Sequence, residues 1–414
     1  MAGRKREDCF RIPMRTIARL CLLWICVTGL ESYGSAQARP NHKTVEWQSI
    51  RGVNFFPSYA SNAHEAWSRF DATVVDRELG WARGLGFNSV RVWLSVAAYE
   101  KAPSDFNRHL RRFMDLCRKH RLTVMLVLFD CCGIEPRRDA VPATVYQAYR
   151  QFLQDSRLTT AERELVKTRY QQFAEGRGRE MWVDVSPNSP FDILFWQSWS
   201  PNPGLRRLQS REGWSGLERY VDSILELGTQ EPFVIAFDMM NEPGCLFDFP
   251  PGMNRTRAET TVRDFVRHMS RYARSKYPTA VLTIGSQSIS QMKALADETT
   301  ILSFHTYERG AELKSELAEA TAFAQSQNKP VLLTECLANT DNWLKTHGEE
   351  SLASDDGQLR HYQETLPVIQ RSRIGWYSWG FIAGRMFTPF TDILYPNGYR
   401  RPAAVYLEWQ LRQE

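Results

Sequence analysis

Short runs of apolar, strand-forming residues alternate with longer segments whose apolar positions recur at helical spacing, from about residue 45 onwards. The strand-like runs lie at residues 51–56, 88–95, 122–130, 233–243, 281–286, 301–307, 331–335 and 374–381. The clearest helical segments lie at residues 71–85, 106–120, 216–227, 261–277 and 311–325. This alternation is typical of parallel strands joined by crossover helices, so it predicts an α/β fold, and eight such strands suit a barrel.

One connection breaks this rhythm. About a hundred residues separate the third strand-like run from the fourth, whereas a barrel connection needs only a helix and short loops. We therefore predict a long insertion after strand 3, at about residues 131–215, which leaves the barrel at the face where barrel enzymes carry their active sites. Its aromatic residues could line a cleft or anchor the insertion to the barrel: Trp182, Phe191, Phe195, Trp196, Trp199 and Trp214.

Two of the strand-like runs end in a carboxylate. The run 233–243 (FVIAFDMMNEP) ends in Asn241, Glu242 and Pro243, and the run 331–335 (VLLTE) ends in Glu335. A single glutamate after a strand is usually an ordinary solvated strand end. Because the C-terminal ends of parallel barrel strands meet at one face, however, this pair can work together. Two carboxylates, one protonated and one ionised, are what hydrolysis of a glycosidic bond requires.

Other strand ends carry residues that suit the same chemistry. Arg91 lies in an apolar strand, so it needs a carboxylate partner, either a catalytic one or one in a structural ion pair. His305 and Tyr307 are two positions apart, so a strand would direct both to the same side, where they can hydrogen-bond a sugar or orient a nucleophile. Trp379 offers an indole face to a pyranose ring, unless it only packs in the core.

The first 38 residues resemble a cleavable secretory signal. Basic residues precede an apolar run at 20–30 that is too short to span a bilayer, and Ala36-Gln37-Ala38 is a small-x-small site. An uncleaved anchor helix is the alternative. Cleavage would leave residues 39–414 as a single secreted or periplasmic domain with no further membrane-spanning segment. Residues 1–38 contain six basic and three acidic residues, so their loss lowers the formal charge from +5 to about +2, which gives no reason to expect a nucleic acid as partner.

Five cysteines remain after this cleavage: Cys117, Cys131, Cys132, Cys245 and Cys336. Because the number is odd, at least one thiol is free unless it pairs between molecules. Four of them follow predicted strand ends and so lie at one face of the barrel. There is no CxxC or HxxxH spacing, so buried thiols with one disulfide at most are favoured over a metal site. No metal or cofactor is expected.

The ordered set Arg91, Asn241-Glu242-Pro243, His305-x-Tyr307, Glu335 and Trp379 resembles glycoside hydrolase clan A, most nearly family 5 with its cellulases and mannanases. The resemblance covers about residues 51–409 apart from the insertion. It implies a (β/α)8 TIM barrel, to which this chain adds the predicted insertion after strand 3, and a retaining double displacement. Glu242 would then be the acid/base and Glu335 the nucleophile, with their carboxyl groups roughly 5 to 5.5 Å apart.

The resemblance also implies roles for the surrounding residues. Arg91 and Tyr307 would hold the nucleophile, and Arg91 would favour the ionised form of Glu335. The implied substrate-binding residues are Asn241 at the sugar 2-hydroxyl, His305, and Trp379 as the floor of the subsite. One departure concerns strand three, where family 5 members often carry a histidine and this chain has Phe129-Asp130-Cys131-Cys132. The identity of the sugar therefore stays open, and Asp130 is an alternative acceptor for a hydroxyl.

The expected function is that of a secreted retaining β-glycoside hydrolase acting on a polysaccharide or oligosaccharide of the β-mannan or β-glucan type. Mannanase, endoglucanase and exo-β-glycosidase activities all stay open, as does the oligomeric state. One alternative is a non-catalytic carbohydrate-binding protein on a barrel that has lost its activity, although the intact pair of glutamates argues against it. Another is a metal-dependent barrel hydrolase that uses the cysteines and that loses activity with chelators.

Overall fold

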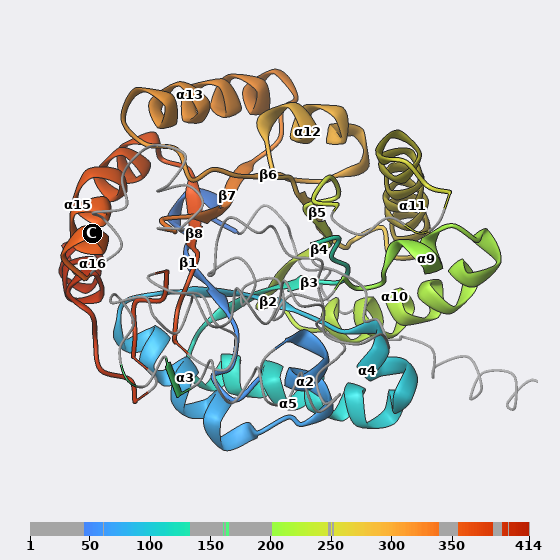
Figure 1. The fold of residues 1–414 in the computed structure, drawn as a ribbon, viewed down its shortest axis with the longest axis horizontal. Helices are drawn as coiled ribbons and strands as arrows, with labels where there is room; N and C mark the ends of the chain where they lie inside the picture. The colour runs from blue at the N-terminus through green and yellow to red at the C-terminus, as the bar shows by residue number, and fades with distance from the viewer. Residues whose placement is uncertain are drawn as a thin grey trace, which may run out of the picture. The chain divides into compact units, whose positions relative to one another are not determined.

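The computed structural model describes residues 45–60, 62–132, 160, 163–164, 201–246, 250, 252–338, 355–383, 391–395 and 397–413. Its centre is an eight-stranded parallel sheet in the order β5-β4-β3-β2-β1-β8-β7-β6 (Figure 1). The strands are β1 (Arg51–Phe55), β2 (Ser89–Trp93), β3 (Thr123–Val127), β4 (Val234–Asn241), β5 (Leu282–Gly285), β6 (Leu302–His305), β7 (Val331–Cys336) and β8 (Gly375–Ser378). The predicted barrel strands are all present.

The remaining junction, between β5 and β6, is closed by backbone hydrogen bonds. The amide of Thr300 donates to Leu282 O at 2.7 Å, and the amide of His305 donates to Ser286 O at 2.8 Å. The predicted (β/α)8 barrel is therefore confirmed. Its circular arrangement brings the C-terminal ends of strands that are far apart in the sequence to a single face.

Helices surround the strands in Figure 1. They are η2 (Trp47–Ser49), α2 (Ala63–Ser68), α3 (Ala72–Gly84), α4 (Val96–Lys101), α5 (Pro103–Lys119), α9 (Leu205–Leu208), η4 (Arg211–Gly213), α10 (Trp214–Gly228), α11 (Arg255–Lys276), α12 (Ile289–Ala294), η5 (Ala296–Glu298), α13 (Gly310–Ser326), α15 (Asp355–Ser372) and α16 (Pro402–Leu411). Several of these helices begin at a residue whose side chain caps the first turn. The Asp71 side chain accepts hydrogen bonds from backbone amides at the start of α3, and the Asn254 side chain accepts one from the amide of Arg257 in α11.

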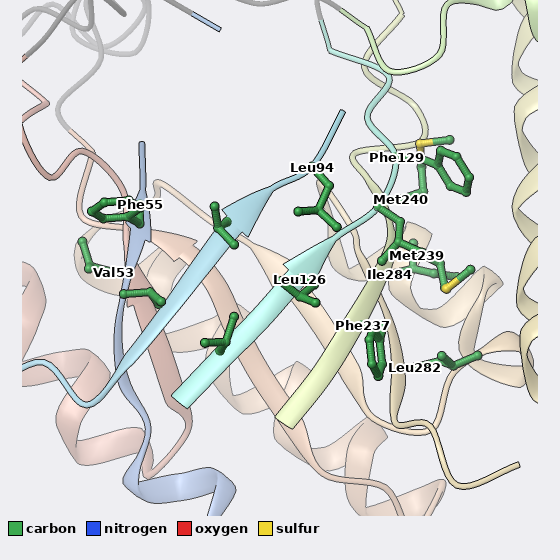
Figure 2. Packing of buried hydrophobic residues seen from close by; sticks show 14 of the residues in the cluster. Val53, Phe55, Leu94, Leu126, Phe129, Phe237, Met239, Met240, Leu282 and Ile284 are labelled. Atoms are coloured by element: carbon green, nitrogen blue, oxygen red, sulfur yellow. The ribbon is translucent and has the colours of Figure 1, made fainter. Parts of the chain in front are cut away.

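The main core lies between the strands and these helices. Figure 2 shows Val53 and Phe55 of β1 with Phe237 of β4 in this layer, and the ring of Phe55 lies 5.9 Å from that of Phe113 in α5. A second cluster includes Met125 of β3. The residues before and after Met125 belong to the main core, so its own side chain points the other way, into the barrel interior. This alternation determines which side of each strand reaches the candidate site.

Most strands end one to three residues earlier than the sequence predicts, and two of these differences concern candidate site residues. The strand predicted at 301–307 ends at His305, so Tyr307 lies in the following loop, and the strand predicted at 374–381 ends at Ser378, just before Trp379. The predicted signal segment, residues 1–38, and most of the predicted insertion, residues 133–200 apart from 160 and 163–164, lie outside the described residues. Among the residues described, no helix is both long and apolar enough to cross a membrane.

Candidate active site

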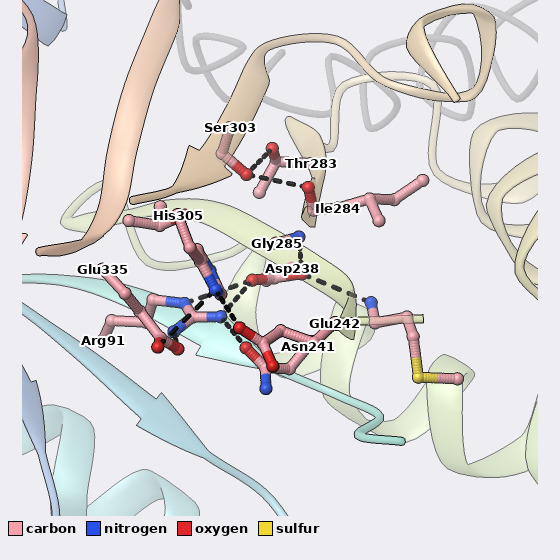
Figure 3. Close-up of polar contacts among 12 residues, drawn as sticks. Arg91, Asp238, Asn241, Glu242, Thr283, Ile284, Gly285, Ser303, His305 and Glu335 are labelled. Carbon is pink, nitrogen blue, oxygen red and sulfur yellow. Dashed lines mark hydrogen bonds and ion pairs between the residues drawn. The ribbon is translucent and has the colours of Figure 1, made fainter. Parts of the chain in front are cut away.

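A buried arginine lies at the centre of the polar cluster inside the barrel (Figure 3). Arg91 of β2 is fully buried, and its Nη1 donates to Glu335 Oε1 at 2.8 Å and to Asn54 Oδ1 at 3.0 Å. Its Nη2 donates to Asp238 Oδ2 at 2.8 Å and to Asn241 Oδ1 at 2.6 Å. Charge-assisted bonds of this kind compensate the loss of hydration on both sides. The arginine therefore links the ends of β4 and β7.

Asp238 is a site residue that the sequence analysis did not single out. It is fully buried in β4, where it binds Arg91 and accepts the amide of Gly285 at 2.9 Å. The sequence does contain a sign of its role, because Asp238 is an acidic residue inside an otherwise apolar run. Strict alternation would nevertheless direct Asp238 and Asn241 to opposite sides of the strand.

Irregular strand pairing resolves this conflict. Between the pairs Asp238↔Thr283 and Asn241↔Gly285, β4 contains one more residue than β5, so Met239 and Met240 both join the outer core. A similar shift in β7 lies between Leu333 and Cys336. Such bulges change the direction of the side chains that follow them. They turn Asn241 and Glu335 into the barrel mouth.

The two glutamates lie close together. One carboxylate oxygen of Glu242, one carboxylate oxygen of Glu335 and one ring nitrogen of His305 all lie within 4.8 Å of one another. Nδ1 of His305 lies 2.7 Å from Glu242 Oε1 and 3.5 Å from Glu335 Oε2. The hydroxyl of Tyr307 donates to Glu335 Oε2 at 2.5 Å. The structure thus brings together four residues that the sequence analysis selected separately.

The backbone at Glu242 is in a rare conformation. Its φ is +42°, in the left-handed region that costs a residue other than glycine about 1–3 kcal/mol. The amide of Glu242 donates to Gly285 O at 2.7 Å, and that of Cys245 donates to Glu242 O at 2.9 Å. These bonds hold the carboxylate in place at the end of β4, where backbone strain is typical of a functional site.

Asn241 is fixed from two sides. Its Oδ1 accepts from Arg91, and its Nδ2 donates to Asp130 Oδ1 at 3.2 Å. The same Asp130 oxygen accepts the amide of Cys132 at 2.7 Å. Burial raises the pKa of Asp130 well above its usual value, and the negative charges of Glu242 and Glu335 add to this. Asp130 therefore orients Asn241 in this structure.

The five cysteines of the described residues are all free, so none of them forms the disulfide that the sequence analysis allowed. The thiol of Cys132 donates to Glu242 Oε2 at 3.0 Å. Cys245 is also close to this pair, because the sulfur atoms of Cys132 and Cys245 and one carboxylate oxygen of Glu242 lie within 4.8 Å of one another. Burial raises the pKa of Cys132 well above its usual value and that of Cys245 to about 12.

The surroundings of the two glutamates shift their pKa values in opposite directions. Burial alone raises the pKa of Glu242, but the hydrogen bond and charge of His305, with bonds from Cys132 and Cys245, outweigh it and lower this pKa to about 2. Burial also raises the pKa of Glu335, and there the opposing effects of His305, Arg91 and Tyr307 do not compensate. Arg91 lowers the pKa of Glu335, as expected, but the burial of Glu335 outweighs this effect.

Aromatic side chains border the glutamates. Trp93 and Trp379 meet edge to face with ring centroids 5.5 Å apart, and the guanidinium of Arg91 lies 4.5 Å from the Trp93 ring centroid. Trp379 is 6% exposed, and with Trp93 and Phe56 it lines a small hollow. Little of its ring faces solvent, and its role as the floor of a subsite stays a prediction.

Gly285 leaves space for this cluster. A Cβ at this position would lie 2.7 Å from both Arg91 Nη2 and Asp238 Oδ2. We expect Gly285→Ala to lower the free energy of unfolding by about 1–3 kcal/mol, because overpacking a buried site forces its neighbours to move. Urea unfolding measures this. Gly84→Ala is the matched control, because nothing lies within 4 Å of the added methyl; equal stability of the two variants would contradict the prediction.

No protein-family model matches the sequence, and a search of curated proteins finds no match. Solved structures of glycosidases match its fold at low identity. A GH5_18 variant from Streptomyces cattleya in complex with Manβ1-4GlcNAc has a TM-score of 0.55 and 16% identity, over 88% of this chain and 81% of that one. An endo-1,4-β-mannanase from Rhizomucor miehei matches with a TM-score of 0.50 and 12% identity, over 87% of this chain and 96% of that one.

An exo-β-1,4-mannosidase from Opitutaceae bacterium strain TAV5 matches with a TM-score of 0.51 and 15% identity, over 87% of this chain. This chain spans 59% of the length of that mannosidase. At these identities the likeness shows the fold, which is the (β/α)8 barrel found in clan A glycoside hydrolases.

Proposed function

We propose that this protein is a retaining β-glycoside hydrolase in which Glu335 is the nucleophile and Glu242 the acid/base. The observation that carries the proposal is the separation of their carboxylate oxygens, which is within 4.8 Å. Retaining glycosidases hold the two carboxyl groups roughly 5–5.5 Å apart, whereas inverting enzymes need roughly 6.5–9.5 Å to admit a water molecule between them. The spacing in this site therefore favours direct attack by one carboxylate.

The contacts of Glu335 support the role of nucleophile. Arg91 Nη1 binds one of its oxygens and the Tyr307 hydroxyl binds the other. These two donors fix both oxygens of the carboxylate. A carboxylate held in this way can attack the anomeric carbon as the leaving oxygen departs.

The reaction needs a proton on Glu242 and a negative charge on Glu335. His305 is the main group that lowers the pKa of Glu242, so a glycosidic oxygen that replaces His305 at Glu242 Oε1 raises this pKa. The proton then resides on Glu242, which can protonate the leaving oxygen while the ionised Glu335 attacks. When Glu335 becomes an ester, its charge is lost, and Glu242 can release its proton to activate water.

This arrangement predicts that activity falls as the pH rises. The reactive form carries one proton on the two glutamates, and because burial raises the pKa of Glu335, this proton is lost as the pH rises through that raised pKa. We therefore expect kcat/KM for an aryl β-glycoside to fall as the pH rises above that point. Rates measured between pH 4 and 9, with folding checked at each pH by circular dichroism, test this. A kcat/KM that rises throughout that range would contradict it.

The proposed substrate is an oligosaccharide or polysaccharide of the β-mannan or β-glucan type. The names of the structural neighbours, which include an exo-β-1,4-mannosidase and an endo-1,4-β-mannanase, support the mannan side of this range. Sugar release from mannans, β-glucans, xylans and short aryl β-glycosides is the test. Release from one class supports the proposal. A folded protein that binds a glycan but cleaves nothing in the panel would instead be a carbohydrate-binding protein.

We also propose that residues 1–38 direct the protein to the periplasm or the outside of the cell. The basic residues and the apolar run at 20–30 support this. N-terminal sequencing of the protein from its export compartment should give Arg39 as the first residue. A protein that retains residue 1 and sediments with membranes would indicate an uncleaved anchor instead.

A further inference from the structure

Two cysteines form a cluster with Glu242, the proposed acid/base, and glycoside hydrolysis does not use their thiols. Cys132 follows β3, and Glu242 and Cys245 occupy the turn after β4. Their two Sγ atoms and one carboxylate oxygen lie within 4.8 Å of one another, and Cys132 Sγ is 3.0 Å from Glu242 Oε2. The hydrogen bond from the Cys245 amide to Glu242 O, at 2.9 Å, fixes the spacing within the turn.

These donors suit a thiophilic cation. Zn²⁺ binds cysteine sulfur at about 2.3 Å and carboxylate oxygen at about 2.0–2.2 Å in tetrahedral geometry. Such a geometry brings its ligand atoms within about 4 Å of one another, which small rotations of these side chains can reach. Hard cations such as Ca²⁺ and Mg²⁺ require oxygen ligands instead. The chemistry of the cluster therefore selects zinc-like ions over the common hard cations.

The geometry points to a binding site for a divalent cation of the Zn²⁺ class, with Cys132, Cys245 and Glu242 as ligands and water in the fourth position. Binding converts two thiols and a carboxylate into a complex with two thiolates and the carboxylate, and it releases two protons to solvent. Cys245 is only partly buried, so this side of the site is the more accessible to an ion from solvent. The sequence lacks a CxxC motif because the two sulfurs come from different loops.

A cation at this site should affect catalysis, an inference that rests on the proposed function of Glu242 as the acid/base. A cation on Glu242 occupies the carboxylate that must carry the proton, so it should inhibit hydrolysis. Zinc availability would thus regulate the activity through the acid/base itself.

Cobalt is the direct probe of the site. The full mature protein, kept reduced with a phosphine and freed of metal with a chelator, is titrated with Co²⁺. We expect one equivalent to bind, with a sulfur-to-cobalt charge-transfer band in the near ultraviolet and visible bands of tetrahedral Co²⁺, and Zn²⁺ to displace it. Cys245→Ser and Cys132→Ser should each weaken binding at least about tenfold and reduce the charge-transfer band, because each removes one thiolate ligand.

Cys117→Ala is the matched control, since Cys117 is buried in α5 outside the cluster and its loss should leave the cobalt spectrum unchanged. Thermal unfolding by circular dichroism checks each variant. Cys245→Ser, at the more exposed position, decides the test if Cys132→Ser does not fold. The absence of a charge-transfer band, or a band that persists in the Cys132→Ser/Cys245→Ser double variant, would overturn the proposal.

A second arm concerns inhibition. For a glycoside that the protein cleaves, Zn²⁺ should suppress the rate over the concentration range in which it displaces Co²⁺, and a chelator should restore the rate. Full activity with the site loaded would refute the regulatory role. The cobalt spectrum does not depend on hydrolysis, so failure of the proposed function and failure of the metal site give different results.

Discussion

Glu335→Ala should lower kcat by a factor on the order of 10⁴ or more on every glycoside that the wild-type protein cleaves. The variant cannot form the glycosyl-enzyme, and a missing nucleophile removes the whole double displacement from the pathway. Arg91 and Tyr307, which bind this carboxylate in the structure, have no nucleophile left to orient. We therefore expect only the slow reaction that substrate binding and the remaining charges support.

The space left by the Glu335 side chain makes this result specific. Azide can enter it and attack an aryl β-glycoside with a good leaving group, which yields the α-glycosyl azide. Glu312→Ala is a matched control, because Glu312 is an exposed residue in the first turn of α13. The prediction fails if Glu335→Ala keeps more than a hundredth of the wild-type rate without azide, or if Glu312→Ala loses as much activity.

Arg91→Leu should lower the free energy of unfolding by about 3–5 kcal/mol, because it leaves buried negative charges without their partner. Asp238 and Glu335 both form ion pairs with this guanidinium inside the barrel. Asn54 and Asn241 lose a donor at the same time. The loss is much larger than that of an ordinary surface ion pair.

Urea unfolding of two further variants separates this cause from a simple loss of packing. Arg108→Leu removes an exposed ion pair, with Asp105, and should change stability little. Arg91→Leu combined with Asp238→Asn removes one of the uncompensated charges and should recover part of the loss. If Arg91→Leu lowers the free energy of unfolding no more than Arg108→Leu does, the prediction is contradicted.

Much of the fold and part of the site could be predicted because strand periodicity and strand ends are local features of the sequence. Glu242, Glu335 and Arg91 stand out as polar residues in or after apolar runs. The barrel then brings them together whatever the length of the connections between them, so an insertion after strand 3 does not disturb the prediction. His305 and Tyr307 reach the glutamates even though only His305 lies in β6.

Other parts depend on irregularities that no local pattern shows. The extra residue in β4 directs both Asp238 and Asn241 into the barrel, and strict alternation gives no sign of it. The contact between Cys132 and Glu242 joins two loops. The direction of the Glu335 pKa shift could not be predicted either, because the balance between burial and charge there depends on every neighbour in three dimensions rather than on Arg91 alone.

Product stereochemistry is the most direct test of the proposed double displacement. Proton NMR of the first sugar released from the best substrate of the panel, recorded before mutarotation, distinguishes the two anomers. Attack by Glu335 followed by attack of water predicts the β anomer as the first product. An α anomer formed first would mean a single displacement by water, and it would contradict the assignment of Glu335 as the nucleophile.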